Sequence, residues 1–171
     1  MNTALKARLA ELRDALAIAQ IYNRGIEDRT ATFETEPRTA EVVEGLLHAR
    51  ANRYPAVVVE DVTHVLGFAW TSEYRPRSAY AGVAEFTIYV ARAARGQGVG
   101  RLALGALITE AERRGFWKLV SRIFPENVAS RRLCAALGFR EVGTYRRHAQ
   151  LDGRWMDCVI VECLLGAAAR D

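Results

Sequence analysis

The chain has 171 residues, of which 50% are hydrophobic and 26% are charged. This length and composition are typical of one globular domain and exclude the disordered, collagen-like and coiled-coil classes. The 24 basic and 20 acidic residues give a net charge of +4, which is too small to require a nucleic-acid partner but suits a small anionic ligand. Three cysteines without CxxC spacing argue against a disulfide framework and a zinc site, so we expect no metal.

The N-terminal segment lacks the pattern of an export signal. Leu5 and Ala7 alternate with Lys6 and Arg8, whereas a signal peptide needs an unbroken apolar stretch of about 7–15 residues. We also find no apolar run of the roughly 18 residues that a membrane helix needs. We therefore expect a cytoplasmic protein without a membrane anchor, with one domain over residues 1–171.

Strand-like and helix-like apolar periods alternate along the chain. We expect strands over residues 3–10, 56–60, 66–71, 84–90, 119–123, 141–150 and 156–165. We expect helices over residues 14–25, 39–52, 101–114 and 127–137. Thr39 is predicted to cap the start of its helix, Gly138 to follow the end of another, and Asp152 and Gly153 to form a hairpin turn. This order predicts an α/β fold with strands in mixed order.

The strongest local signal is a glycine-rich turn between a predicted strand and a predicted helix. Residues 95–101 contain Gly96, Gly98 and Gly100, and glycine permits a positive φ and a close approach of backbone to ligand. Free N–H groups and the helix dipole at such a position favour phosphate oxygens. The spacing fits neither a P-loop, GxxxxGK[ST], nor the GxGxxG of a dinucleotide fold. The turn is thus either a different anion site or a purely structural turn.

Residues 95–100 resemble the Q/R-x-x-G-x-G/A signature of the GNAT acetyltransferases. Stretches that resemble the phosphinothricin, arsinothricin and methionine sulfoximine N-acetyltransferases follow in that branch's order, at residues 21–23, 32–37, 74–80, 85–90, 123–130 and 153–157. The resemblance implies a largely antiparallel twisted sheet with helices on both faces. It further implies a metal-free homodimer that uses acetyl-CoA to acetylate the α-amino group of a small glutamate-like amino acid, which confers resistance.

The resemblance also implies where acetyl-CoA binds. The residues implied for cofactor binding are Ile88, Val90, Arg95, Gly96, Gln97, Gly98, Val99, Gly100, Arg101, Asn127 and Ser130. Asn127 stands at the predicted start of a helix, where its side chain is also suited to capping. Both roles are compatible with the sequence.

Amine acetylation needs a deprotonated amine, so a general base assists at neutral pH. The resemblance implies that Glu85 is this base; the alternative is a solvated strand glutamate. The residues implied for substrate binding are Phe33, Arg75, Arg77, Thr87 and Tyr89. Two arginines at i and i+2 can share carboxylate, phosphinate or arsinate oxygens only if Pro76 bends the segment. Otherwise they belong to an exposed basic loop.

Cys134 departs from the family pattern, because many relatives have histidine at this place. A thiol cannot act as an imidazole does, and a small buried side chain is the alternative. Since no activating base is visible beside Cys134, we expect direct transfer in a ternary complex. Two other functions stay open: acetylation of a polyamine, aminoglycoside or protein N-terminus, and CoA sensing without turnover.

Overall fold

The structure of the protein is a computed structural model that describes residues 4–170. Its seven-stranded sheet has the order β1-β2-β3-β4-β5-β7-β6. The strands are β1 Lys6–Leu9, β2 Ala56–Glu60, β3 Val65–Glu73, β4 Val83–Val90, β5 Lys118–Ile123, β6 Arg140–Leu151 and β7 Arg154–Leu164. β4 and β5 are parallel, whereas the other neighbouring strands are antiparallel. The predicted mixed and largely antiparallel sheet is confirmed.

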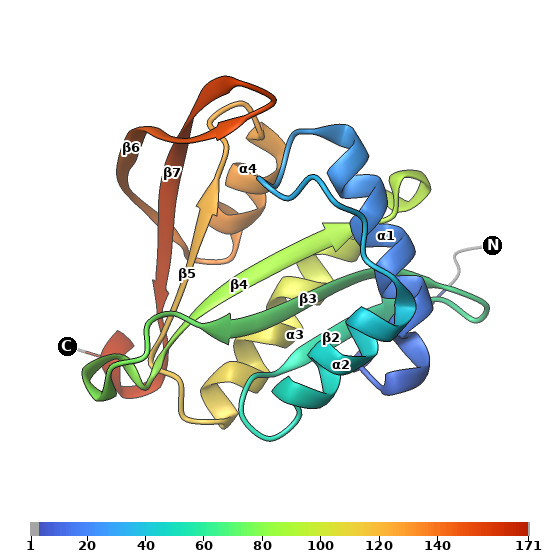
Figure 1. The fold of residues 1–171 in the computed structure, drawn as a ribbon. Helices are drawn as coiled ribbons and strands as arrows, with labels where there is room; N and C mark the ends of the chain where they lie inside the picture. The colour runs from blue at the N-terminus through green and yellow to red at the C-terminus, as the bar shows by residue number, and fades with distance from the viewer. Residues whose placement is uncertain (1–3, 171) are drawn as a thin grey trace.

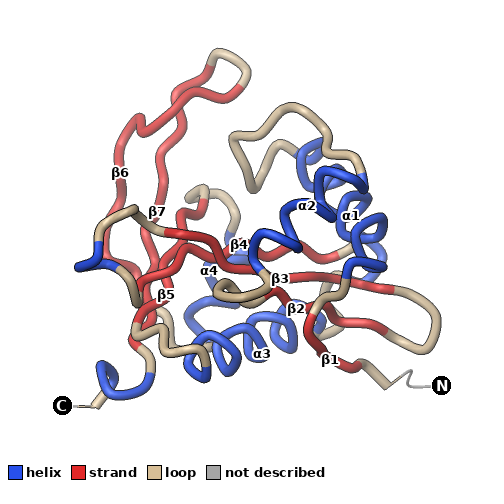
Figure 2. Tube along the Cα trace, turned by 60° about the horizontal axis from the view of Figure 1, so that its bottom comes forward, coloured by secondary structure: helices blue, strands red, loops and turns tan. Residues whose placement is uncertain are grey.

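Helices cover both faces of this sheet (Figures 1 and 2), as predicted. They are α1 Ala15–Asp28, α2 Ala40–Arg50, α3 Val99–Arg113 and α4 Val128–Ala136. Strand residues alternate between the two layers: Val57 and Val59 pack with α3, whereas Val58 packs with α1 and α2. This alternation follows from the two-residue period of a strand and produces one apolar cluster on each face of the sheet.

Two residues that the sequence predicted to mark helix ends do so in the structure. Thr39 caps α2 by accepting a hydrogen bond from the Val42 amide at 3.3 Å, and Gly138 follows α4 with a φ of 87°. Residue 3, where the first strand was predicted to begin, lies outside the described residues. Within the described part of the chain, no helix is long and apolar enough to cross a membrane.

β6 is less regular than the sequence predicted. Its register with β7 shifts twice, and Arg147 has a positive φ of 48°. The Asp157 carboxylate accepts a hydrogen bond from the Arg147 amide at 2.7 Å, which stabilises the irregular backbone. A bulge of this kind depends on the partner strand, so the alternating pattern of β6 alone does not predict it.

The sheet opens between its two parallel strands. β4 and β5 pair only from Val83 opposite Lys118 to Glu85 opposite Val120, and beyond this point they diverge (Figure 1). Ser121 Oγ donates a hydrogen bond to the Phe86 carbonyl oxygen at 2.9 Å, where the gap begins. The gap gives a ligand access to one edge of β4, which leads directly to the glycine-rich turn.

Candidate active site

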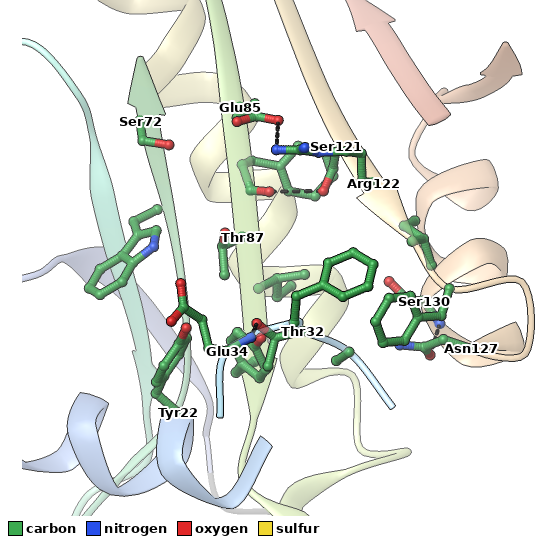
Figure 3. A pocket seen from close by; sticks show the side chains of 18 of the residues that line it. Tyr22, Thr32, Glu34, Ser72, Glu85, Thr87, Ser121, Arg122, Asn127 and Ser130 are labelled. Atoms are coloured by element: carbon green, nitrogen blue, oxygen red, sulfur yellow. Dashed lines mark hydrogen bonds and ion pairs between the residues drawn. The ribbon is translucent and has the colours of Figure 1, made fainter. Parts of the chain in front are cut away.

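A cavity of about 350 Å³ lies beside β4, where the sheet opens. Figure 3 shows Tyr22 and Glu34 on one side of β4 and Asn127 and Ser130 on the other. The lining therefore combines α1, the loop that follows it, the central strands and the start of α4. A volume of this size suits a small molecule.

Glu85 lies on β4 at the last position where β4 pairs with β5. Its Oε1 atom accepts a hydrogen bond from Arg122 Nη2 at 2.7 Å, and the two side chains are 26% and 49% exposed. Glu85 also lines a second hollow, which it shares with Tyr74 and Arg75. The carboxylate thus stands between two hollows, and the Arg122 contact fixes its position. The sequence did not single out Arg122.

Three of the predicted substrate residues line the cavity: Phe33, Thr87 and Tyr89. Phe33 packs edge-on against Phe124 with ring centroids 4.9 Å apart. Tyr89 packs edge-on against Tyr22 with centroids 5.0 Å apart. Burial raises the pKa of both tyrosines, so their hydroxyl groups stay protonated and can donate hydrogen bonds at neutral pH.

The other two predicted substrate residues, Arg75 and Arg77, lie on the exposed loop after β3. The Arg77 amide donates to the Arg75 carbonyl oxygen at 2.8 Å, which makes a tight turn centred on Pro76. The bend that a shared grip requires is therefore present. Arg75 packs over the Tyr74 ring and lines the second hollow. Arg77 precedes a short 3-10 helix. Among the described residues, it belongs to the lining of neither the cavity nor the second hollow.

The glycine-rich turn has the backbone geometry of an anion site. Gly96 and Gly98 have φ values of 76° and 87°, and Gly98 directly precedes α3 without a capping side chain. A Cβ atom built on either glycine would meet nothing within 4 Å, whereas one on Gly100 would lie 3.1 Å from Leu133. Gly100 therefore serves packing, but the first two glycines serve a positive φ and leave open space before the helix. The free amides of the first helical turn are groups of the kind that bind phosphate oxygens.

Side chains at this turn are held by other parts of the protein. Arg95 Nη2 lies 2.8 Å from Asp28 Oδ2, and Arg92 pairs with the same carboxylate. Hydrogen bonds from Arg95 and Arg92 lower the pKa of Asp28, so it stays ionised. Gln97 donates to the Ala93 carbonyl oxygen at 2.8 Å. The backbone, more than these side chains, is thus available to a ligand.

The remaining predicted cofactor residues lie along β4 and at two helix starts. Ile88 and Val90 are partly buried against the α3 side of the core, Val99 is fully buried, and Arg101 is exposed on the first turn of α3. A separate pair, Asn127 and Ser130, lines the cavity at the start of α4.

The Asn127 side chain makes two hydrogen bonds at the start of α4. Its Oδ1 atom accepts a hydrogen bond from the Ser130 amide at 3.2 Å. Its Nδ2 group donates to the Thr30 carbonyl oxygen at 3.4 Å, which ties α4 to the loop after α1. The capping role is present, and it places the side chain at the edge of the cavity.

Cys134 lies away from the cavity in the core beneath α4, where it is fully buried. Burial raises the pKa of its thiol to about 12, so the thiolate that a covalent route needs is not formed at neutral pH. Among residues 4–170, no cluster of three or more His, Cys, Asp or Glu side chains is placed to hold a metal ion.

Several side chains that line the cavity were given no site role from the sequence, because they come from segments far apart in the chain. They include Tyr22, Glu34, Arg38, Arg50, Trp70, Ser72, Ser121 and Arg122. Asn23, which lies in the stretch at residues 21–23, accepts from the Arg38 amide and donates to the Arg38 carbonyl oxygen, both at 2.8 Å. This double contact folds the loop after α1 back over the cavity.

Comparisons with known proteins agree with this geometry. Residues 18–139 match the model of the Acetyltransferase (GNAT) family. The chain is 36% identical, over 84% of its length and 86% of the relative's, to a phosphinothricin N-acetyltransferase of Streptomyces coelicolor. It is 33% identical to an L-methionine sulfoximine/L-methionine sulfone acetyltransferase of Pseudomonas paraeruginosa, over 91% of each chain. An acetyltransferase from Salmonella typhimurium, solved with its cofactor acetyl-CoA, superposes with a TM-score of 0.92 at 31% identity and covers 98% of each chain.

Proposed function

This chain belongs to the GNAT acetyltransferase family and is an N-acetyltransferase, and we propose that it acetylates the α-amino group of a small glutamate-like amino acid. Phosphinothricin, arsinothricin and methionine sulfoximine are acceptors of this class. Acetylation would remove the charge of the amino group and detoxify such a compound, so the expected biological role is resistance. The observation that carries the proposal is the position of Glu85 between two hollows, on the strand that leads to the glycine-rich turn.

Acetyl-CoA is the acetyl donor and supplies an activated acetyl thioester when it is bound. The residues suited to hold it are the turn at 95–101, the open edge of β4 with Ile88 and Val90, and Asn127 with Ser130. The free amides before α3 suit phosphate oxygens because they combine unpaired N–H groups with the helix dipole. The open space in front of Gly96 and Gly98 leaves room for those groups.

Glu85 is the general base of the proposal. Its carboxylate, held by Arg122 at 2.7 Å, accepts a proton from the α-ammonium group, directly or through a water molecule. Phe33, Thr87 and Tyr89 form walls of the cavity around the acceptor. A general base of this kind contributes about 10²–10⁴-fold to the rate.

Arg75 and Arg77 give the proposal its preference for acidic acceptors. Arg75 lines the hollow on the far side of Glu85, and the bend at Pro76 brings the two residues onto one short turn. Their guanidinium groups suit phosphinate, arsinate or carboxylate oxygens. A cationic acceptor such as a polyamine would be repelled from this side.

We also propose that residues 1–171 act as one catalytic domain and assemble as a homodimer. Figure 2 shows the β6–β7 hairpin extending away from the helices. Val142, Tyr145 and Trp155 on this hairpin are 49%, 53% and 58% exposed, which supports an interface there. Light scattering after size exclusion measures the mass in solution. The cytoplasmic location stays a prediction.

The test is a panel of acceptors assayed by release of free CoA and compared by kcat/KM. It contains phosphinothricin, arsinothricin, methionine sulfoximine, methionine sulfone, glutamate, spermidine and a peptide with an N-terminal alanine. We expect the acidic amino-acid analogues to have the highest kcat/KM. A preference for spermidine or the peptide would move the enzyme to another substrate class. CoA binding without turnover of any amine would support the sensory alternative.

A further inference from the structure

Two arginines that lie far from Arg75 and Arg77 line the main cavity. Arg38 comes from the loop after α1 and Arg50 from the last turn of α2, and both line the cavity that Glu85 also borders. Each is only partly exposed. Arginine side chains are mostly exposed in folded proteins, so two partly buried arginines are a distinctive feature of this lining.

Arg50 is held rigidly by neutral groups. Its Nε atom donates to the Thr71 carbonyl oxygen at 2.9 Å, and its Nη1 atom donates to the Leu46 carbonyl oxygen at 3.0 Å. The guanidinium lies over the Trp70 ring, 4.6 Å from the centroid. Among residues 4–170, no carboxylate forms an ion pair with Arg50. The side chain is thus oriented in advance, and its positive charge is left without a counter-ion.

Arg38 is fixed through its backbone. Asn23 binds its amide and its carbonyl oxygen, both at 2.8 Å, and its guanidinium lies over the Tyr22 ring at 4.3 Å from the centroid. The contact with the Glu34 carboxylate is long, at 3.7 Å, and the Glu34 side chain is 55% exposed. Glu34 therefore neutralises Arg38 only in part.

The two charges act on one another. Burial lowers the pKa of Arg50, and the positive charge of Arg38 lowers it further. Two like charges at one cavity destabilise the free protein, and an anion between them would relieve this repulsion. Planar guanidinium groups suit the two oxygens of a carboxylate.

We propose that Arg38 and Arg50 form a second anion subsite, which binds the α-carboxylate of the acceptor amino acid. The proposal rests on the proposed function, because it assigns this carboxylate to the cavity and the side-chain acid to the hollow of Arg75. Glu85 stands between the two places and faces the amine that lies between the two anionic groups. The enzyme would accordingly select acceptors that carry a free α-carboxylate, which a polyamine lacks.

The test compares phosphinothricin with its α-carboxamide, which keeps the side-chain phosphinate and the amine. The protein is assayed as the parent and as Arg38→Gln, Arg50→Gln and Arg50→Lys. We expect Arg38→Gln and Arg50→Gln to lower kcat/KM for the acid by roughly 10- to 100-fold and for the carboxamide by less than about threefold. Arg50→Lys should recover part of the loss. Ratios of variant to parent cancel the different basicity of the two amines.

Arg53→Gln is the matched control, because Arg53 makes the same kinds of contact outside the cavity. It donates to the Arg114 carbonyl oxygen at 2.9 Å and lies 4.1 Å from the centroid of the Phe116 ring. It should leave both acceptors unchanged. Arg38→Gln leaves the contacts of Arg50 intact, so it tests the subsite even if Arg50→Gln does not fold.

Calorimetry with the same two compounds separates this proposal from the proposed function. Weaker binding of the acid, but not of the carboxamide, to Arg38→Gln supports the subsite whether or not the parent turns the acid over. Equal losses for both compounds, or no loss for the acid, would overturn it. If the parent binds but does not acetylate phosphinothricin, the proposed function fails and the binding data still decide the subsite.

Discussion

The glycine-rich turn before α3 and the cavity beside β4 present different chemical groups to a ligand. The turn is one continuous segment, residues 95–101, with two positive φ angles, and the groups that we propose bind phosphate are its backbone amides. The cavity is made of side chains from α1 and the loop after it, α2, four strands and the start of α4. One region depends on local conformation, whereas the other depends on the whole fold.

This difference has a consequence for specificity. A site made of backbone amides binds phosphate whatever side chains surround it, provided that the glycines keep their φ values. A cavity made of distant side chains changes its preferred ligand whenever one of them changes. In the proposed function, the turn therefore determines which donor the protein uses, and the cavity determines which amine it accepts.

The most damaging change at the acceptor side should be Glu85→Gln. It removes the proton acceptor but keeps the shape and one hydrogen-bond acceptor for Arg122. We expect kcat to fall by about 10²–10⁴-fold with little change in acetyl-CoA affinity. Steady-state kinetics between pH 7 and pH 9.5 should show a loss that shrinks as the pH rises, because more of the amine is then already neutral.

Glu73→Gln is the control for this experiment, since Glu73 is an exposed residue on the neighbouring strand, opposite Ala84. It should leave kcat unchanged. A Glu85→Gln enzyme with a normal rate at pH 7 would make Glu85 a structural partner of Arg122.

Arg75→Ala and Arg77→Ala should have the next largest effect. Each should raise KM by roughly 10- to 100-fold for acceptors with a phosphinate or arsinate group, because a charge-assisted contact is lost. An amine acceptor without that group should be used almost equally by variant and parent. If acetyl-CoA affinity falls instead, these arginines belong to the donor side. If neither changes, they form a solvated loop and the preference for acidic acceptors loses its main support.

Gly98→Val tests the donor side of the comparison. A β-branched residue at a φ of 87° is strained, at a cost of about 1–3 kcal/mol, and its side chain enters the space before the helix. We expect acetyl-CoA to bind at least about tenfold more weakly to the folded variant, measured by calorimetry.

Gly105→Val is the matched control on the same helix, because a Cβ atom there also meets nothing within 4 Å and the backbone is helical. It should leave cofactor affinity unchanged. Normal affinity in a folded Gly98→Val protein would place the phosphate groups elsewhere.

The contrast between the two regions also explains what the sequence could predict. The periods of the apolar residues, Thr39, and the turn at Asp152 and Gly153 predicted the elements and their order, because each is a local signal. The glycine-rich turn was found for the same reason, whereas the bend at Pro76 was only one of two alternatives.

The contacts that join distant segments could not be predicted in this way. Arg122 and Glu85 are 37 residues apart and meet only because β4 and β5 are parallel in one register. Arg38 and Arg50 both line the cavity because α2 packs against α1 and Asn23 binds the backbone of Arg38 in the intervening loop. No periodicity in a single sequence specifies such a pairing of segments.

The smallest expected effect on catalysis belongs to Cys134→Ala. Burial penalises the thiolate and raises the pKa of the thiol to about 12, so at pH 8 only about one thiol in 10⁴ is ionised. Cys134 should therefore react slowly with iodoacetamide in the folded protein and fully after unfolding. Because it lies in the core and away from the cavity, its replacement should lower the free energy of unfolding by roughly 1 kcal/mol and change kcat by less than about twofold. Mass spectrometry of the alkylated protein, denaturant unfolding and steady-state kinetics measure the three quantities.

Two results would contradict direct transfer and favour a covalent route through Cys134. One is rapid alkylation of the native thiol. The other is an acetylated enzyme that is trapped with acetyl-CoA alone and does not form with Cys134→Ala.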